Sequence, residues 1–112
     1  MPYLHVHTNV SVENHADFLT RCSHGAAWAL EKPESYVMVE LSDQRPMLFA
    51  GSDQPLAFVE LKSLGLSPID TAHVSSKISN LIHKELGIDV SRIYIEFESP
   101  ERDMFGWKGG TF

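Results

Sequence analysis

The chain has 112 residues, 43% of them hydrophobic and 21% charged, and its formal net charge is −6. This size and composition predict one globular domain over residues 1–112 with a modest core. The acidic balance and the lack of a basic stripe exclude nucleic-acid binding and docking on acidic membranes, and no apolar run approaches the ~20 residues of a membrane span. The single cysteine, Cys22, rules out an intrachain disulfide.

The N-terminal segment bears on the compartment that we predict. Residues 1–8 contain neither a cationic stretch nor a long apolar stretch, so no secretory signal is recognisable in them. A lone cysteine also fits a reducing environment. We therefore expect a cytoplasmic protein, with release by a non-classical route as the alternative.

The first half of the chain predicts a strand, a helix and a second strand. Residues 3–8 alternate polar and apolar side chains, as a strand does. Residues 15–30 carry a helical apolar stripe, and Lys32-Pro33 ends this helix because a residue before proline avoids the α region. We attribute Gly25, inside the helix, to close packing on a sheet. Residues 36–41 are a nearly continuous run of β-forming side chains.

The second half predicts the same order of elements. Residues 47–50 follow a proline and favour a short strand at a sheet edge. Residues 56–64 predict the next long strand. A helix should start at Ser67 and Pro68, an N-cap followed by a first-turn proline, and end before Gly87. Residues 92–97 predict the last long strand, and a glycine-rich tail with three aromatic residues follows it.

The two halves superpose when the sequence is shifted by 56 residues, which brings the stripe Phe18, Cys22, Ala26, Leu30 on to Val74, Ile78, Ile82, Leu86. Two β-α-β units predict an α+β fold with one four-stranded sheet, parallel pairing within each half, and both helices on one face. The predicted strands are apolar on more than one face. We therefore expect another copy of the chain to cover the bare face of the sheet, which is the face without helices. Short strands at 47–50 and near Phe105 would pair across subunit edges.

Pro2 stands directly behind Met1. Methionine aminopeptidases remove an initiator methionine that precedes a small residue, so we expect a mature chain that begins with the secondary amine of Pro2. The pyrrolidine ring fixes φ, and the amine therefore has little freedom to move. Burial in an apolar pocket or a nearby cation lowers the pKa of such an amine from its usual ~8. A neutral amine at pH 7 can act as a general base or a nucleophile.

The order and spacing of short segments along the whole chain resemble a known family. The segments are Met1-Pro2, Thr8-Asn9-Val10, Lys32-Pro33, Gly51-Ser52, Ser63-Leu64-Gly65, Arg92-Ile93-Tyr94-Ile95, Gly106-Trp107 and Thr111-Phe112. From Pro2 to Phe112 the sequence resembles the macrophage migration inhibitory factor family of the tautomerase superfamily. The resemblance implies a homotrimer in which three sheets form a central barrel with the helices outside. It also implies a keto–enol tautomerase site at each subunit interface, and neither it nor the residues themselves require a cofactor.

The resemblance implies specific roles for four residues. The neutral amine of Pro2 would remove a proton beside the carbonyl of a phenylpyruvate-type α-keto acid and return it at the other end of the enol system. Lys32 would lower the pKa of that amine and hold the substrate carboxylate or an enolate oxygen; by itself the sequence favours a simple helix-end cation. The backbone amide of Leu64 would donate to the carboxylate, and Tyr94 of a neighbouring subunit would pack on the substrate ring.

Further residues would line the pocket. The resemblance places four aromatic side chains there, for which packing alone is an alternative explanation: Tyr36, Phe105, Trp107 and Phe112. At Glu96, well-known animal members carry an asparagine, whose amide can donate a hydrogen bond that an ionised glutamate cannot. Glu96 would also repel a substrate carboxylate and raise the pKa of Pro2. We therefore expect weak activity on phenylpyruvate or a preference for another substrate.

Metal binding, thiol–disulfide chemistry and functions without catalysis are the alternatives to a tautomerase. His5 and His7 share one side of a predicted strand, but the sequence shows no third ligand close to them, so we predict no metal site. Leu56 and Val59 occupy places where animal members carry a Cys-x-x-Cys, so no thiol–disulfide function is expected. The alternatives to the enzyme are a cytokine-like protein that binds a receptor, with weak or vestigial tautomerase activity, and a trimeric interaction module without chemistry.

Overall fold

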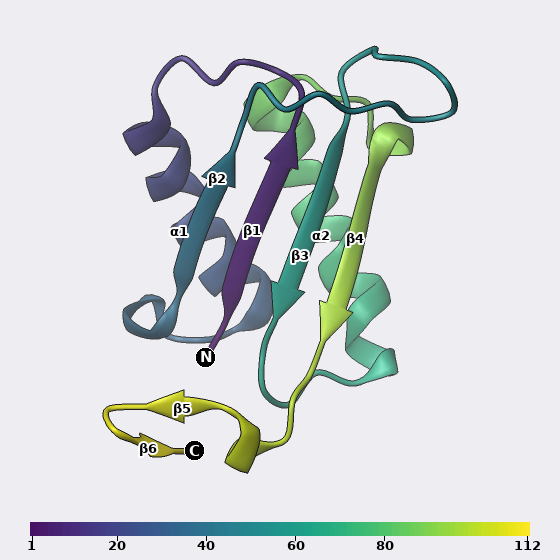
Figure 1. Ribbon diagram of the computed structural model, residues 1–112. Coiled ribbons are helices and arrows are strands. Elements are labelled where there is room, and N and C mark those ends of the chain that lie inside the picture. Colours follow the sequence, from purple (N-terminus) through teal and green to yellow (C-terminus); the bar gives the residue numbers. More distant parts are fainter.

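A four-stranded sheet organises the protein, and the computed structural model describes all of residues 1–112. Its strands are β1 (Tyr3–Thr8), β2 (Met38–Ser42), β3 (Ala57–Lys62) and β4 (Ile93–Glu98), in the order β2-β1-β3-β4. The pairs β1–β2 and β3–β4 are parallel and β1–β3 is antiparallel. Helices α1 (His15–Leu30) and α2 (Pro68–Leu86) lie on one face of the sheet (Figure 1). These observations confirm the predicted α+β fold and its parallel pairing within each half.

The hydrophobic core lies between the sheet and the helices. In β1 and β3 every second side chain is buried, among them Leu4, Val6, Val59 and Leu61. The predicted helix stripes face this layer with Phe18, Cys22 and Ala26 from α1, and Val74, Ile78 and Ile82 from α2. Burial raises the pKa of the Cys22 thiol to about 12, so this cysteine is a packing residue. Neither helix has the length and apolar character that crossing a bilayer requires.

Gly25 packs against the other helix and not against the sheet as we expected. A Cβ atom at this position would lie 2.6 Å from Cδ2 of Leu81, a residue of α2. Because glycine has no side chain there, α1 can approach α2 more closely than another residue would permit. The predicted close approach is present, but its partner is different.

Residues 47–50 do not form the predicted edge strand. Only Phe49 and Ser52 pair, through two backbone hydrogen bonds of 2.9 and 3.0 Å. The residues between them, Ala50 and Gly51, have φ values of 53° and 73°, and two positive φ values in succession are typical of a type I′ hairpin turn. The guanidinium of Arg92 holds this turn by donating to the carbonyl oxygens of Phe49, Ser52, Gln54 and Pro55 over 3.0 to 3.2 Å.

Two other local predictions need adjustment. The second strand begins at Met38 and not at residue 36, because residues Glu34–Tyr36 form a 3₁₀ turn. In the tail, β5 (Gly106–Trp107) and β6 (Gly110–Thr111) pair with each other as a small antiparallel hairpin. The extra strand predicted near Phe105 thus has its partner within the chain, and the hairpin lies at the same end of the sheet as the N-terminus (Figure 1).

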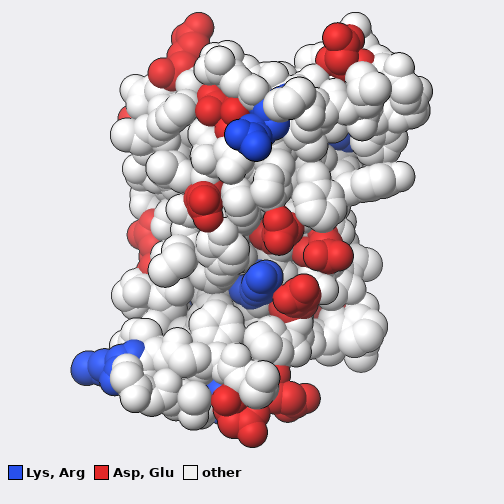
Figure 2. All heavy atoms as spheres, in the orientation of Figure 1, with Lys and Arg blue, Asp and Glu red and all other residues white.

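The middle of the sheet face that carries no helix is polar, and apolar side chains such as Met38 and Tyr94 lie towards its ends, so our expectation of strands that are apolar along both faces was wrong. Val39, Leu41 and Ile95 pack against the core, and the residues between them point the other way because side chains alternate along a strand. Figure 2 looks on to this bare face and shows acidic side chains gathered over its middle. The strand registers place four residues in one row across it: Glu40, His5, Glu60 and Glu96.

We predict that Arg92→Met destabilises the turn at 49–52 and the fold. The substitution keeps an unbranched side chain but removes the guanidinium that reaches four carbonyl oxygens. Because hydrogen bonds from a charged donor contribute about 1.5–3 kcal/mol, we expect the free energy of unfolding in urea to fall by about 2–3 kcal/mol. Amide hydrogen exchange in residues 49–55 should become faster.

Arg21→Met is the matched control for this experiment. Arg21 is exposed and pairs with a single carboxylate, Glu85. Exposed ion pairs of this kind contribute little because water competes for both partners. Equal losses of stability in the two variants would contradict a structural role for the Arg92 contacts.

Candidate functional site

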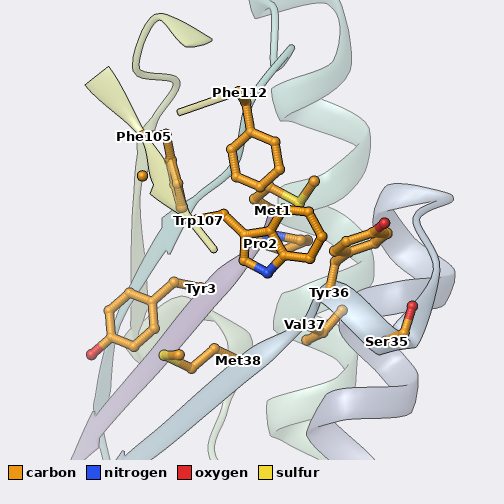
Figure 3. A pocket seen from close by; sticks show the side chains of 11 residues that line it. Met1, Pro2, Tyr3, Ser35, Tyr36, Val37, Met38, Phe105, Trp107 and Phe112 are labelled. Atoms are coloured by element: carbon orange, nitrogen blue, oxygen red, sulfur yellow. The ribbon is translucent and has the colours of Figure 1, made fainter. Parts of the chain in front are cut away.

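A cavity of about 270 Å³ opens at the end of the sheet that holds both chain termini (Figure 3). The N-terminus, the 3₁₀ turn with the start of β2, and the C-terminal hairpin supply its walls. Eight of its 11 lining residues are hydrophobic, which suits a small organic ligand with an apolar part. The lining residues are Met1, Pro2, Tyr3, Ser35, Tyr36, Val37, Met38, Phe105, Gly106, Trp107 and Phe112.

Pro2 lines this cavity and is itself fully buried. Its carbonyl oxygen accepts a hydrogen bond of 2.9 Å from the backbone N–H of Met38, which ties the start of the chain to the start of β2. The N-terminal amine, carried here by Met1, has its pKa lowered by burial and, second, by the positive charge of Lys32. Both effects make the amine easier to deprotonate than an ordinary chain terminus.

The C-terminal hairpin contributes a layer of aromatic rings. Trp107 and Phe112 stack with ring centroids 5.5 Å apart, and the edge of Tyr36 meets Trp107 at 5.6 Å. Phe105 contacts Phe112 at 5.8 Å, and the backbone N–H of Phe112 donates to the carbonyl of Phe105 at 3.1 Å. Figure 3 shows the rings of Trp107, Phe112 and Tyr36 grouped around Met1 and Pro2. All four aromatic residues expected in the pocket are therefore brought together.

Lys32 and Leu64 lie together in a neighbouring cavity of about 160 Å³ that faces α2. The ammonium of Lys32 donates to the carbonyl oxygen of Leu64 at 3.3 Å. The Leu64 side chain is buried, and Gly65 after it has a positive φ of 77° that turns the chain towards α2. Lys32 therefore acts on the N-terminus through its charge, without lining the same cavity as Pro2.

Tyr94 and Glu96 lie outside both cavities. Tyr94 pairs in register with Phe58, which pairs in turn with His7 near the far end of β1. This register puts Tyr94 at the opposite end of the sheet from Pro2. The Tyr94 ring is 63% exposed and contacts the Phe49 ring at 4.7 Å. One chain by itself therefore cannot combine Pro2 with Tyr94.

Six of the lining residues were not predicted from the sequence: Met1, Tyr3, Ser35, Val37, Met38 and Gly106. A signal for two of them was available, because parallel pairing of the first two strands places Tyr3 opposite Met38, beside Pro2. The hydroxyl of Tyr3 donates to the Glu40 carboxylate, and this hydrogen bond raises the pKa of Tyr3 to about 12. Tyr3 is therefore a neutral wall residue at physiological pH.

Solved structures with the same fold define the class of protein. The macrophage migration inhibitory factor from Trichinella spiralis superposes with a TM-score of 0.90 at 34% identity, covering 98% of this chain and 99% of the other. The macrophage migration inhibitory factor homologue from Prochlorococcus marinus also gives a TM-score of 0.90, at 38% identity and 98% coverage of both chains. The β-α-β repeat of this chain is thus the fold of macrophage migration inhibitory factor structures, which belong to the tautomerase superfamily.

Sequence comparison identifies the family within that class. Residues 1–112 match the family model described as macrophage migration inhibitory factor (MIF). The macrophage migration inhibitory factor homolog of Brugia malayi is 37% identical over 100% of this chain and 99% of its own length, and the macrophage migration inhibitory factor of Mus musculus is 30% identical over the same shares. The chain belongs to the macrophage migration inhibitory factor family.

Proposed function

We propose that this protein is a keto–enol tautomerase that acts on phenylpyruvate-type α-keto acids, with Pro2 as its general base. The position of Pro2 carries the proposal, because it is buried in an aromatic cavity at an N-terminus where burial and the charge of Lys32 lower the pKa of the terminal amine. Removal of Met1 would expose the proline nitrogen as a secondary amine at that place. The aromatic and aliphatic walls suit the ring of the substrate.

The reaction moves one proton within the substrate. The lone pair of the Pro2 amine takes a proton from the carbon beside the carbonyl, and the electrons of the broken C–H bond form the C=C bond of the enol while the carbonyl oxygen becomes negative. The ammonium of Pro2 then returns the proton to that oxygen. Burial and the Lys32 charge, which lower the pKa of the terminal amine at this place, would increase the share of neutral amine available for the first step.

The substrate carboxylate needs a donor set, for which we propose Lys32 and the backbone N–H of Leu64. The Lys32 ammonium already lies against the end of β3, 3.3 Å from the Leu64 carbonyl oxygen. A bound carboxylate would attract this ammonium away from a neutral carbonyl, since a charge-assisted hydrogen bond is the stronger of the two. The developing enolate oxygen would be stabilised by the same cation.

We infer that the complete site forms between copies of the chain in a homotrimer. Pro2 and Tyr94 lie at opposite ends of one sheet, so a second subunit would have to supply Tyr94. Tyr94 borders an apolar cavity of about 270 Å³ that includes Leu48 and Phe49, and Leu48 is 69% exposed. Arg92 keeps this segment ordered although it has no strand partner, which suits pairing with another chain.

Receptor binding in the manner of a cytokine is the second candidate function. Exposed apolar side chains on the two helices favour it. In the proposed trimer the helices would lie outside the barrel, so these side chains would remain accessible to another protein. Trp28 in α1 is 66% exposed and Ile69 in α2 is 88% exposed. Exposed apolar groups of this size are typical of contact surfaces for other proteins when they form a patch.

We predict that Pro2→Gly lowers kcat/KM for phenylpyruvate tautomerisation by about 10²-fold or more, the usual contribution of a general base. Glycine permits removal of Met1 as proline does, but its primary amine is not held by a ring. The assay compares protein batches whose N-termini have been verified by mass spectrometry. Absence of activity in a verified Pro2-terminal sample across a range of pH would overturn the proposal.

A pH profile of the same reaction tests Lys32. Activity of the wild-type chain should fall as pH decreases through the pKa of the amine, because the protonated amine has no lone pair. Lys32→Met removes a charge that lowers this pKa, so the acid limb of kcat/KM should move to higher pH. An unchanged acid limb would exclude an electrostatic role for Lys32.

We predict that Glu96→Gln raises kcat/KM for phenylpyruvate. Glu96 is exposed and adjoins Glu60 in the strand register, so it adds to a negative field that opposes an anionic substrate. Glutamine removes the charge and supplies an N–H donor, and Glu96→Asn should act in the same direction. If both variants keep wild-type rates, repulsion by Glu96 is not a determinant of activity.

We further predict that two inactive variants, Pro2→Gly and Tyr94→Ala, recover activity when unfolded together and refolded as a mixture. Random 1:1 assembly would restore a Pro2 and Tyr94 pair at about one interface in four. Light scattering checks that each variant assembles alone. Activity no greater than the mean of the separately refolded variants would show that the site does not combine residues of two chains.

A further inference from the structure

We propose that His5, His7 and Glu60 form a binding site for a divalent transition-metal ion of the zinc class on the bare face of the sheet. His5 and His7 are two residues apart on β1 and therefore point to the same side. Glu60 lies directly opposite His5 on the neighbouring strand β3. The sequence shows no third ligand close to the two histidines, because Glu60 is more than fifty positions away and only the antiparallel register brings it beside them.

The three donor groups converge closely enough to share one ion. Their ligand atoms all lie within 4.8 Å of one another. Nε2 of His7 is 2.6 Å from Oε1 of Glu60, and the two imidazole rings are 3.8 Å apart between centroids. Zinc bonds of about 2.0–2.2 Å at tetrahedral angles separate donor atoms by roughly 3.3 Å, so small side-chain rotations would complete the site.

The side chains around His5 would hold its ring in place. The Tyr3 hydroxyl lies 3.2 Å from Nδ1 of His5, and the Ser42 hydroxyl lies 2.9 Å from Nε2. Whichever nitrogen faces the metal, the other keeps an oxygen partner, which is the usual way in which a metal-bound imidazole is oriented. The site is also sheltered, because the side chains of His5, His7 and Glu60 are only 15%, 27% and 29% exposed.

The charge of the bare face favours a cation. Glu40 and Glu96 lie in the same row as His5 and Glu60, and Figure 2 shows that acidic side chains predominate over the middle of this face. Two cations border this region: Lys62 in the adjoining row, 3.9 Å from a carboxylate oxygen of Glu98, and Arg45, which lines a cavity together with His7. In the proposed trimer three such faces would line the barrel, where a bound cation would offset their mutual repulsion.

The donor set selects the type of ion. Two imidazoles and one carboxylate suit Zn²⁺ and other first-row divalent ions, whereas Mg²⁺ and Ca²⁺ prefer sites made of oxygen atoms alone. Three protein ligands leave at least one coordination position for water. The three ligands belong to one chain and none of them lines the Pro2 cavity, so metal binding does not require the proposed tautomerase activity; Tyr3 alone contacts His5 and lines that cavity.

The test uses the untagged full chain, stripped of metal with a chelator and titrated with ZnCl₂ in a calorimeter. We expect one Zn²⁺ per chain and no heat of binding with Mg²⁺. Imidazole ¹⁵N NMR of the wild-type protein should show shifts of His5 and His7 on zinc addition, a readout that needs no variant. His5→Gln, His7→Gln and Glu60→Gln should each weaken binding at least tenfold.

His24→Gln is the matched control, because His24 is an exposed histidine paired with one carboxylate, Glu34, at 3.1 Å. Zinc affinity should be unchanged in this variant and in Pro2→Gly. The zinc measurement therefore tests the metal site whether or not the protein proves to be a tautomerase. Failure of wild-type protein to bind zinc, or binding that survives in both His7→Gln and Glu60→Gln, would overturn the inference.

Discussion

The hydrogen bond from the backbone N–H of Met38 to the carbonyl oxygen of Pro2 fixes the geometry on which the site depends. It extends the parallel pairing of β1 with β2 to the second residue of the chain. Chain termini are usually mobile unless they are tied down, but here the strand that follows Pro2 lies in the middle of the sheet, with partners on both sides. The N-terminal amine is therefore held in one place beside an aromatic cavity and within the field of Lys32.

The same sheet separates two kinds of chemistry on its two faces. Side chains that alternate along β1 direct Leu4 and Val6 into the core, and His5 and His7 on to the bare face. The bare face carries rows of acids and histidines, so covering it with a second hydrophobic layer would leave charged groups buried without water. The barrel of the proposed trimer, which would keep the middle of this face wet, is consistent with that composition, and the exposed segment around Leu48 would then offer an apolar contact to another subunit.

Much of the fold could be predicted from the sequence because its elements have strong local signals. The apolar stripe of residues 15–30 and the proline and glycine that bound residues 68–86 defined both helices at the residues where they are observed. Strand 47–50 could not be predicted correctly, because a two-residue turn of Ala50 and Gly51 and the reach of Arg92 from a distant strand decide that segment. For the candidate site, the resemblance indicated the aromatic wall, while Tyr3 and Met38 required the strand register.

The sequence by itself determined both helices with their buried stripes, the four long strands, and that a proline stands behind Met1 in a chain of this family. These properties depend on side-chain periodicity and on neighbouring residues. Only the tertiary structure decided that Gly25 faces Leu81, that Tyr94 and Pro2 lie at opposite ends of the sheet, and that Glu60 meets His5 and His7. These contacts join residues far apart in sequence, and strand order and register, which no local pattern specifies, bring them together.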